Sequence, residues 1–341
     1  MNQNKINCLI SFLFLFVTDG LAEQKIFETS ELRILTLNLH TYQELSTLGK
    51  KESQLNRNDA LQRVVDYAPI FNTIAKGIDE LEADIICLQE VGEWRESTES
   101  RKSSNINSSK TNSNSFGFDS TNAVKQILAR TKNTQYFYHM DWSHYGWEVW
   151  KEGTAVLSTY PILEKESRYI SNVDNGTYKF WQSRKVTRVK VQYSDTKNIN
   201  VFSVHSGWWD SEKEPFQSQF KRLMEWVDEV ESKDDEVILC GDFNQPSNSK
   251  GYKQITNEYN FIDTYLSGNS TGENSLRMTD PTVNIDADGW KGSHRAERID
   301  YIFIDTNSDF SVKGSERVFT NKKFGIVSDH VGVFTLLTTT D

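Results

Sequence analysis

One stretch of the sequence, residues 237–244, constrains the fold more than any other. It reads Val-Ile-Leu-Cys-Gly-Asp-Phe-Asn, a run of strand-forming residues that stops at a glycine and is followed by the turn-forming Gln-Pro-Ser-Asn. Such a run predicts a buried β-strand that ends in a loop. Alternation along a strand would point Asp242 and Asn244 to one side and Phe243 to the other. An Asx turn after a strand explains the same residues without any function, so this segment alone leaves both interpretations open.

The same pattern, an apolar run beside a polar side chain, recurs along the chain. The further runs span residues 32–39, 84–90, 200–205, 298–304 and 331–337. The polar residues near the ends of all these runs are Asn38, Glu90, His205, Asp242 with Asn244, Asp300, and Asp329 with His330. Each has an ordinary structural explanation as a cap, a turn or a buried histidine. Together they predict strand ends that converge on one site.

Other segments predict helices, two further strands and an insertion. Apolar residues follow helical spacing over 59–82, where Pro69 should break the helix, and an amphipathic helix is expected over 215–231. A short helix at 123–131 and strands at 153–158 and 180–193 complete the expected elements. Residues 93–122 are polar and predict a flexible insertion within a single domain, because strand-like runs of the same style continue beyond it.

The N-terminal residues 1–22 predict a secretory signal peptide. Lys5 precedes an apolar run over 8–17, and small residues lie at the −3 and −1 positions for cleavage after Ala22. We therefore expect a secreted or periplasmic protein with one domain over 23–341. An uncleaved anchor is the alternative, and no later run reaches the length of a membrane span.

Charge and cysteine content narrow the function classes. The formal charge of −10 argues weakly against a nonspecific polyanion binder, although a local basic patch or a bound cation could overturn this. Cys87 and Cys240 lie in apolar runs and predict buried thiols, with a disulfide in an exported protein as the alternative. Because the sequence has no metal-binding cysteine spacing, a tetrahedral zinc site is not expected.

The residue types at the strand ends indicate a chemistry. Carboxylates and carboxamides are hard oxygen ligands for Mg²⁺, Mn²⁺ or Ca²⁺, and imidazoles beside carboxylates suit proton transfer or phosphate contact. This mixture favours metal-assisted attack of water on a phosphoester. Trp208 and Trp290 follow strand ends and could form an aromatic wall for a sugar, a base or a lipid headgroup, or could instead pack under the loops.

These motifs resemble those of the endonuclease/exonuclease/phosphatase superfamily. The matching segments, in its order and spacing, are Leu37-Asn38, Leu88-Gln89-Glu90, Val204-His205-Ser206, Gly241-Asp242-Phe243-Asn244, Arg298-Ile299-Asp300-Tyr301-Ile302 and Ser328-Asp329-His330. The resemblance covers nearly all of residues 32–337. It implies an α+β fold, a four-layer α/β/β/α sandwich of two packed, mostly antiparallel sheets with outer helices.

The resemblance also implies roles for individual residues. The metal site would include Asn38, Glu90 and Asp329, with Glu90 as the direct ligand. The catalytic residues would be His205, Asp242, Asn244, Asp300 and His330. His330 would pair with Asp300 beside the scissile phosphate, and Asp242 would orient or deprotonate the attacking water or assist the leaving oxygen. Asn244 would hold a phosphate oxygen, and His205 would contact the phosphate or act as an acid.

A narrower resemblance concerns the substrate. The segments Trp181-Gln182-Ser183-Arg184-Lys185, Trp208-Trp209-Asp210 and Asp288-Gly289-Trp290 are similar to bacterial maltose 6-phosphate phosphatase-like members, which points to Arg184, Trp208 and Trp290 as substrate-binding residues. A cytoplasmic sugar phosphate conflicts with a signal peptide, however. The substrate is therefore left as a small phosphorylated molecule, a nucleic acid or a phospholipid headgroup.

The expected function is that of an exported, divalent-metal-dependent phosphoesterase, acting as a monomer on a phosphomonoester or a phosphodiester. The alternatives are a secreted nuclease, a sphingomyelinase-like phosphodiesterase and, from a different class, a catalytically silent binding module. Silence is disfavoured because the charged and amide residues of the motifs are all present.

Overall fold

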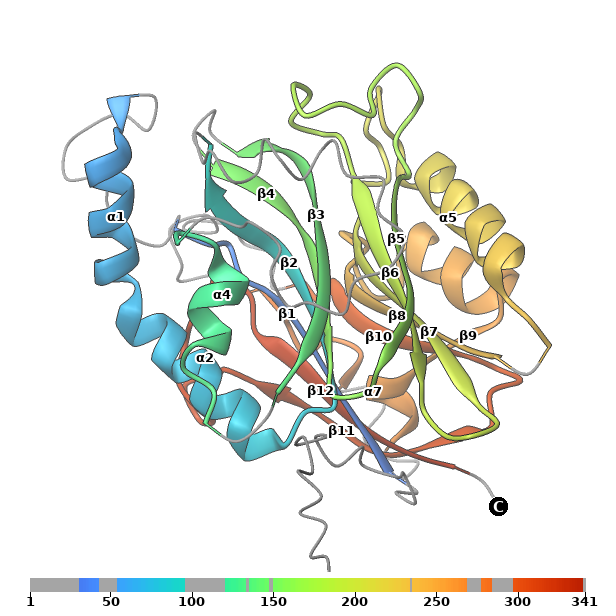
Figure 1. Cartoon of the computed structure of the whole chain (residues 1–341). Helices are drawn as coiled ribbons and strands as arrows, with labels where there is room; N and C mark the ends of the chain where they lie inside the picture. The colour runs from blue at the N-terminus through green and yellow to red at the C-terminus, as the bar shows by residue number, and fades with distance from the viewer. Residues whose placement is uncertain are drawn as a thin grey trace, which may run out of the picture.

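A computed structural model of the chain shows two six-stranded β-sheets packed face to face (Figure 1). It describes residues 31–42, 54–95, 120–132, 135–146, 150–233, 235–268, 277–283 and 297–339. The first sheet has the order β11-β12-β1-β2-β4-β3, and the second has the order β5-β6-β7-β8-β10-β9. Eight of the ten strand pairings are antiparallel. Outer helices complete the four layers, which confirms the predicted fold class.

The strands of the first sheet are β1 (Glu31–Asn38), β2 (Ile85–Trp94), β3 (Phe137–Gly146), β4 (Trp150–Ser158), β11 (Phe310–Val318) and β12 (Gly332–Thr339). Those of the second are β5 (Ile162–Tyr169), β6 (Lys185–Gln192), β7 (Asn198–His205), β8 (Asp235–Asp242), β9 (Phe261–Asp263) and β10 (Asp300–Asp305). The helices are α1 (Arg57–Asp66), α2 (Ala68–Leu81), α4 (Ala123–Leu128), α5 (Phe216–Val230), α6 (Lys250–Lys253), α7 (Thr264–Ser267) and the π-helix η2 (Gln254–Glu258).

Three apolar clusters hold the layers together. Along β1, Leu32 and Ile34 belong to the cluster between the two sheets. Leu35 and Leu37 belong to a second cluster, between the first sheet and helices α1, α2 and α4. A third cluster lies between the second sheet and α5, α6 and η2. Both faces of the central strands are therefore covered, which explains why their sequences are continuous apolar runs.

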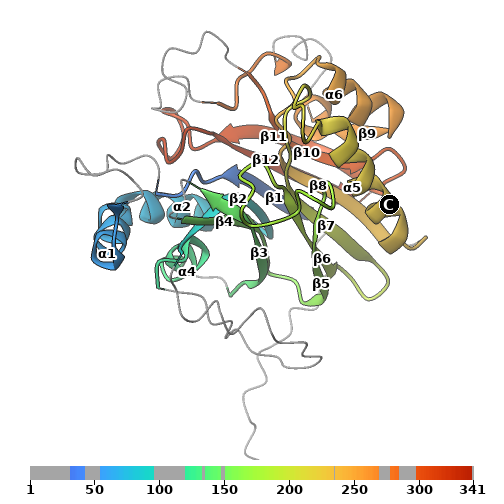
Figure 2. The same cartoon turned by 90° about the horizontal axis from the view of Figure 1, so that it is seen from above.

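The helices flank the sandwich on opposite sides, as seen from above in Figure 2. Helices α1 and α2 lie where one interrupted helix is predicted, and Pro69 stands in the first turn of α2, so the predicted break is confirmed. The amphipathic helix α5 begins after Pro215 and buries Phe216, Phe220 and Leu223. None of the described helices is long and apolar enough to cross a membrane. The predicted signal peptide lies outside the described residues.

Strand direction brings the candidate site residues to one edge. Strand β1 runs parallel to β2, and β7 runs parallel to β8, while β10 and β12 run antiparallel to their neighbours β8 and β1. The carboxyl ends of β1 and β8 therefore meet the amino ends of β12 and β10. In register, Asp242 lies opposite both His205 and Asp300.

The structure changes several predicted element boundaries, and it decides between the free-thiol and disulfide alternatives for the two cysteines. Strand β2 continues through Glu93 to Trp94 because its antiparallel pairing with β4 extends that far, and Asn122 caps α4, so both ends of the predicted insertion belong to ordered elements. Residues 96–119 lie outside the described residues. Strand β6 begins at Lys185 and not at residue 180. Cys87 and Cys240 are buried and free, as predicted.

A buried ion pair anchors the entry to β10. The guanidinium of Arg298 lies 2.7 Å from Asp263 and 4.6 Å from the ring centroid of Tyr301, with both charged side chains almost fully buried. Breaking a buried pair leaves an uncompensated charge, so Arg298→Met should lower the free energy of unfolding by about 3–5 kcal/mol. Urea unfolding would measure this. The matched control is Lys221→Met, which removes an exposed pair with Glu225 and should cost less than about 1 kcal/mol. Equal losses in the two variants would contradict the assigned role.

Candidate active site

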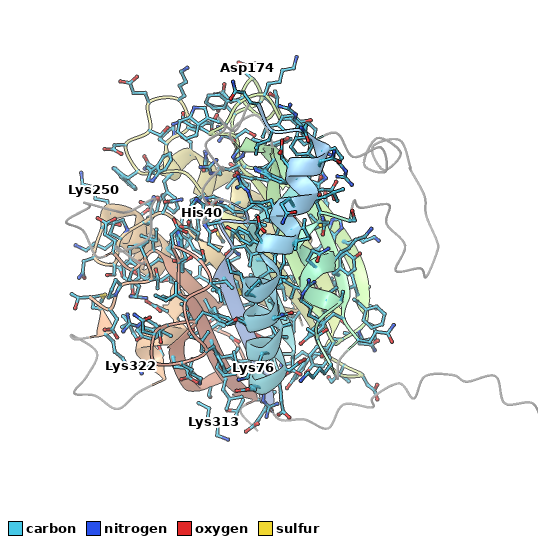
Figure 3. The ribbon with its side chains drawn as sticks, turned by 90° about the vertical axis from the view of Figure 1, so that its left-hand side faces the viewer. His40, Lys76, Asp174, Lys250, Lys313 and Lys322 are labelled. Atoms are coloured by element: carbon cyan, nitrogen blue, oxygen red, sulfur yellow. The ribbon has the colours of Figure 1, made fainter. Side chains whose placement is uncertain are left out.

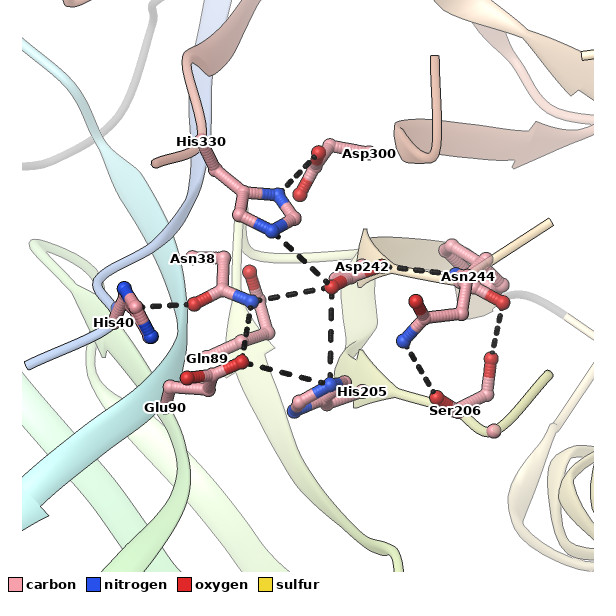
Figure 4. A network of polar contacts seen from close by, with 12 residues as sticks. Asn38, His40, Gln89, Glu90, His205, Ser206, Asp242, Asn244, Asp300 and His330 are labelled. Carbon is pink, nitrogen blue, oxygen red and sulfur yellow. Dashed lines mark hydrogen bonds and ion pairs between the residues drawn. The ribbon is translucent and has the colours of Figure 1, made fainter. Parts of the chain in front are cut away.

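The polar residues predicted at the strand ends lie together at one edge of the sandwich (Figure 4). Figure 3 shows His40, near this edge, between Asp174 at the top of the molecule and Lys313 at the bottom. The strands and the loops that adjoin them bring together Asn38, Glu90, His205, Asp242, Asn244, Asp300 and His330. Asp329 joins this group through its contact with His40. Of these, Asn38, Glu90, Asp329 and His330 come from the first sheet and its connections, and the others from the second.

A line of three buried groups forms the centre. His330 Nδ1 is 2.8 Å from Asp300 Oδ2, and His330 Nε2 is 3.8 Å from Asp242 Oδ2. Burial opposes the charged imidazole, yet the carboxylates of Asp300, Asp329 and Asp242 raise the pKa of His330 well above its ordinary value. His330 is therefore a positively charged group held between carboxylates, with its Nδ1–H donated to Asp300.

The Asp242 carboxyl group has a pKa close to neutral pH. Burial and the charge of Asp300 raise the pKa of Asp242 to about 7, against the lowering effects of His330 and of a backbone hydrogen bond from Asn244. The ordinary aspartate pKa is about 3.9. A carboxyl group in this range can accept and return a proton under physiological conditions.

The turn after β8 has the Asx geometry that the sequence of residues 237–244 allows. The strand ends at Asp242, and Asn244 adopts a left-handed backbone conformation with φ of 51°. Its N–H donates to Asp242 Oδ1 at 2.8 Å, which is an Asx-type turn, and its side-chain amide donates to Ser206 O at 2.9 Å. The strand ends at Asp242, so the left-handed turn and not strand alternation sets the direction of the Asn244 side chain. Phe243 is buried, as predicted, in the third cluster, between the second sheet and its helices.

Glu90 lies within a strand and not at its end, which corrects the prediction. The register of β2 against β4 shifts between Leu88 and Val91, and Glu90 has φ of 46°. Such a bulge re-aims one side chain. Burial and the charges of Glu152 and Asp329 raise the pKa of Glu90, although His40 and a hydrogen bond from Asn38 oppose the shift.

Asn38 connects the two sheets. Its amide Nδ2 lies 3.1 Å from both Glu90 Oε1 and Asp242 Oδ2, and its Oδ1 accepts the N–H of His40 at 3.1 Å. In this orientation Asn38 is a donor to the two carboxylates. It therefore supports the predicted metal residue Glu90 through its nitrogen.

His205 is neutral and close to the same carboxylates. Its Nε2 is 3.7 Å from Asp242 Oδ2 and 3.9 Å from Glu90 Oε1, which is too long for hydrogen bonds. Burial, together with the positive charge of Arg184 and electrostatic interactions with His144 and His330, lowers the pKa of His205 well below its ordinary value. The ring nitrogen can thus face a substrate oxygen without carrying charge.

Asp329 reaches the site beside His40. Its Oδ1 is 3.3 Å from His40 Nδ1 and 3.2 Å from Ser328 Oγ. The carboxylate also raises the pKa of both Glu90 and His330, as described above. Glu90 and Asp329 thus act on each other electrostatically while Asn38 lies beside Glu90.

The donor set fits a divalent cation. Among the described residues, one group of three side chains places ligand atoms within 4.8 Å of one another, and it consists of Asp242, Asp300 and His330. Asp300 Oδ1 is buried with no hydrogen-bond partner in the described part of the chain. Burial and neighbouring carboxylates raise the pKa of Glu90 and of Asp242, so a bound cation would favour their charged forms, and hard oxygen donors suit Mg²⁺, Mn²⁺ or Ca²⁺.

Some residues at this edge were missed by sequence reasoning. Glu152 of β4 lies 3.4 Å from His144 of β3, and His144 also contacts Ser183 O at 3.1 Å. His40, which contacts both Asn38 and Asp329, is likewise absent from the predicted site. No local pattern marks His144 or Glu152, because neither stands at the end of an apolar run.

The substrate residues predicted from the narrower resemblance are partly brought together. The guanidinium of Arg184 is buried, donates to Ser206 O at 3.4 Å, and lies 5.8 Å from the ring centroid of Trp208. Burial lowers the pKa of Arg184, whereas the carboxylates of Glu90 and Glu152 oppose this. Trp290 lies outside the described residues.

The sandwich and the acidic, histidine-bearing edge define a DNase-like fold of the phosphoesterase and nuclease class. The chain belongs to the endonuclease/exonuclease/phosphatase family, whose sequence model matches residues 36–330. A search of the curated proteins found no significant match to this chain.

Solved structures share the fold at low sequence identity. A family protein from Leptotrichia buccalis is 22% identical, with a TM-score of 0.65, over 89% of this chain and 98% of that one. A mannosyl-6-phosphatase from Bacteroides thetaiotaomicron is 17% identical, with a TM-score of 0.56, over 90% and 99%. The catalytic domain of human Nocturnin with bound sulfate is 16% identical, with a TM-score of 0.54, over 91% and 95%.

Proposed function

We propose that the protein is an exported, divalent-metal-dependent phosphoesterase that hydrolyses a phosphomonoester or a phosphodiester by in-line attack of water. The observation that carries this proposal is the buried line of Asp300, His330 and Asp242, which places a positive charge beside a carboxylate with a pKa of about 7. A positive charge suits a phosphate, and the carboxylate suits the attacking water.

Each group has a distinct task in this proposal. Asp300 orients His330, whose Nε2–H would donate to a phosphate oxygen. Asp242 would accept a proton from the attacking water, or would orient that water. Asn244 would hold another phosphate oxygen, and neutral His205 would contact the phosphate or supply a proton to the leaving oxygen.

By the family resemblance, Glu90 and Asp329, with Asn38 in support, would hold the cation. Asp242, Asp300 and His330, whose ligand atoms lie within 4.8 Å of one another, are the alternative set of ligands. In the alternative set, His330 would have to release a ring proton before it could act as a ligand, because the surrounding carboxylates raise its pKa and favour the charged imidazole. When bound, a divalent cation neutralises phosphate charge and stabilises the charge that develops in the transition state. Export rests on the signal-like residues 1–22, and we propose that the protein acts as a monomer on a small molecule, a nucleic acid or a phospholipid headgroup.

A panel of esters tests this function. We expect the purified protein to hydrolyse at least one of para-nitrophenyl phosphate, bis(para-nitrophenyl) phosphate, sphingomyelin and plasmid DNA in Mg²⁺, Mn²⁺ or Ca²⁺. Excess chelator should reduce that rate by about a hundredfold or more, because the cation contributes several kcal/mol to the transition state. Chelator-resistant hydrolysis would contradict the metal dependence. No hydrolysis of any ester in any of the cations would favour the silent binding module.

A further inference from the structure

Two loops beside the site expose a pair of tryptophans. Residues 170–184 connect β5 to β6, and residues 206–215 connect β7 to α5. Trp181 on the first loop is 57% exposed and Trp208 on the second is 40% exposed. Their ring centroids are 6.0 Å apart with an interplanar angle of 54°. The two rings therefore form an open apolar corner between the loops.

Arg184 joins this corner to the catalytic residues. Its Nη1 donates to Trp181 O at 3.1 Å, its Nε donates to Ser206 O at 3.4 Å, and its guanidinium lies over the ring of Trp208. Ser206 O also accepts the side-chain amide of Asn244. The charge of Arg184 acts on the carboxylates of Glu90 and Asp242. Arg184 would thus lie between a group bound in the corner and a phosphate bound at the site.

A buried carboxylate holds both loops in place. Glu214, only 1% exposed, accepts the N–H of Asn172 at 2.9 Å and the side-chain amide of Asn175 at 2.8 Å. On its other side, Glu214 accepts from Gln219 at 3.3 Å, and Gln219 Oε1 accepts the N–H of Gly207 at 2.8 Å. Because Gly207 precedes Trp208, this chain of bonds fixes both loops before any ligand binds.

We propose that Trp181 and Trp208 form a leaving-group subsite for the saturated sugar ring of a phosphomonoester, with Glu214 as its positioning residue; this deepens the proposed function and rests on it. A sugar ring presents an apolar C–H face to one indole and an edge to the other, which suits rings at 54°. A planar base is held best between parallel faces. In this arrangement the Arg184 guanidinium would lie between the sugar ring and the phosphate.

Substrate comparison tests the subsite. Trp181→Ala and Trp208→Ala should lower kcat/KM for a hexose 6-phosphate by about tenfold, while kcat/KM for acyclic glycerol 1-phosphate changes less than about twofold. Trp208→Phe should retain most of the hexose activity. Phe137→Ala removes an exposed aromatic at the far end of β3 and is the matched control. Equal losses on the two substrates, or a selective loss on adenosine monophosphate in place of the hexose, would overturn the proposal.

The positioning role has its own readout. Glu214→Ala should raise KM for the hexose 6-phosphate about as much as Trp208→Ala does, have a smaller effect on glycerol 1-phosphate, and be partly rescued in Glu214→Gln. The exposed neighbour Glu212 gives the matched control Glu212→Ala. A parallel fall of kcat on both substrates would show a merely structural role for Glu214.

Calorimetric binding separates failure of the subsite from failure of the proposed function. The wild-type protein should bind the hexose 6-phosphate about tenfold more tightly than inorganic phosphate, and Trp208→Ala should abolish that difference. If no ester is hydrolysed while this difference persists, the proposed function fails and the subsite stands. If esters are hydrolysed without the difference, the subsite alone is wrong.

Discussion

Asp242→Asn is expected to reduce phosphoester hydrolysis by about a thousandfold or more, equivalent to roughly 4 kcal/mol of barrier. The asparagine keeps the shape of the side chain and can still accept the N–H of Asn244 at 2.8 Å. It loses the titratable carboxylate whose pKa is about 7, and it loses the negative charge facing His330. Steady-state rates on whichever ester the panel identifies would measure the effect.

The control for this variant is Asp228→Asn on the exposed face of α5, which should change the rate less than about twofold. Circular dichroism and urea unfolding establish that both variants fold. Wild-type rates in a folded Asp242→Asn protein would rule out Asp242 as the residue that handles the attacking water.

His330→Ala should cost about a thousandfold in rate, and Asp300→Asn about a hundredfold, because the carboxylate acts through the imidazole. The double variant should lose no more than His330→Ala alone. Removing Asp300 also removes a large part of the field that keeps the imidazole charged. In chelator, the pKa of His330 should therefore fall from its raised value in Asp300→Asn, as measured by proton NMR of the ring.

Additive losses in the double variant would mean that Asp300 acts on the substrate independently of His330. An unchanged pKa of His330 in Asp300→Asn would show that the charge comes mainly from Asp329 and Asp242. Ser328, whose hydroxyl accepts the N–H of His330, supplies a control, since Ser328→Ala should leave that pKa raised.

The convergence of strand ends could be predicted because its signal is local. Asp242 and His205 each end an apolar run, and Asp300 begins one, so strand periodicity alone places them at an edge. The parallel and antiparallel pairing that joins those edges followed from the family resemblance. The fold class likewise followed from that resemblance, which rests on the short motifs at these runs and their order along the chain.

The remaining features depend on contacts that the local sequence does not encode. The bulge at Glu90 arises where β2 and β4 change register, and the position of Asn244 arises from a left-handed turn, so neither follows from strand alternation. His144 and Glu152 join the site because β3 and β4 pair far from any motif. The burial of Arg184 likewise depends on the loops that Glu214 holds.

The bonds across the sandwich give the proposed active site a further property. Three hydrogen bonds join residues of the first sheet and its connections to residues of the second sheet. They link Asn38 to Asp242, His330 to Asp300, and Gln89 to Ser203, the last at 3.0 Å. Neither sheet by itself carries a complete set of reacting groups. The rate of hydrolysis should consequently depend on how the two sheets are aligned. Substitutions at the interface between the sheets that shift one sheet by a fraction of an ångström should therefore lower activity well before they measurably lower stability.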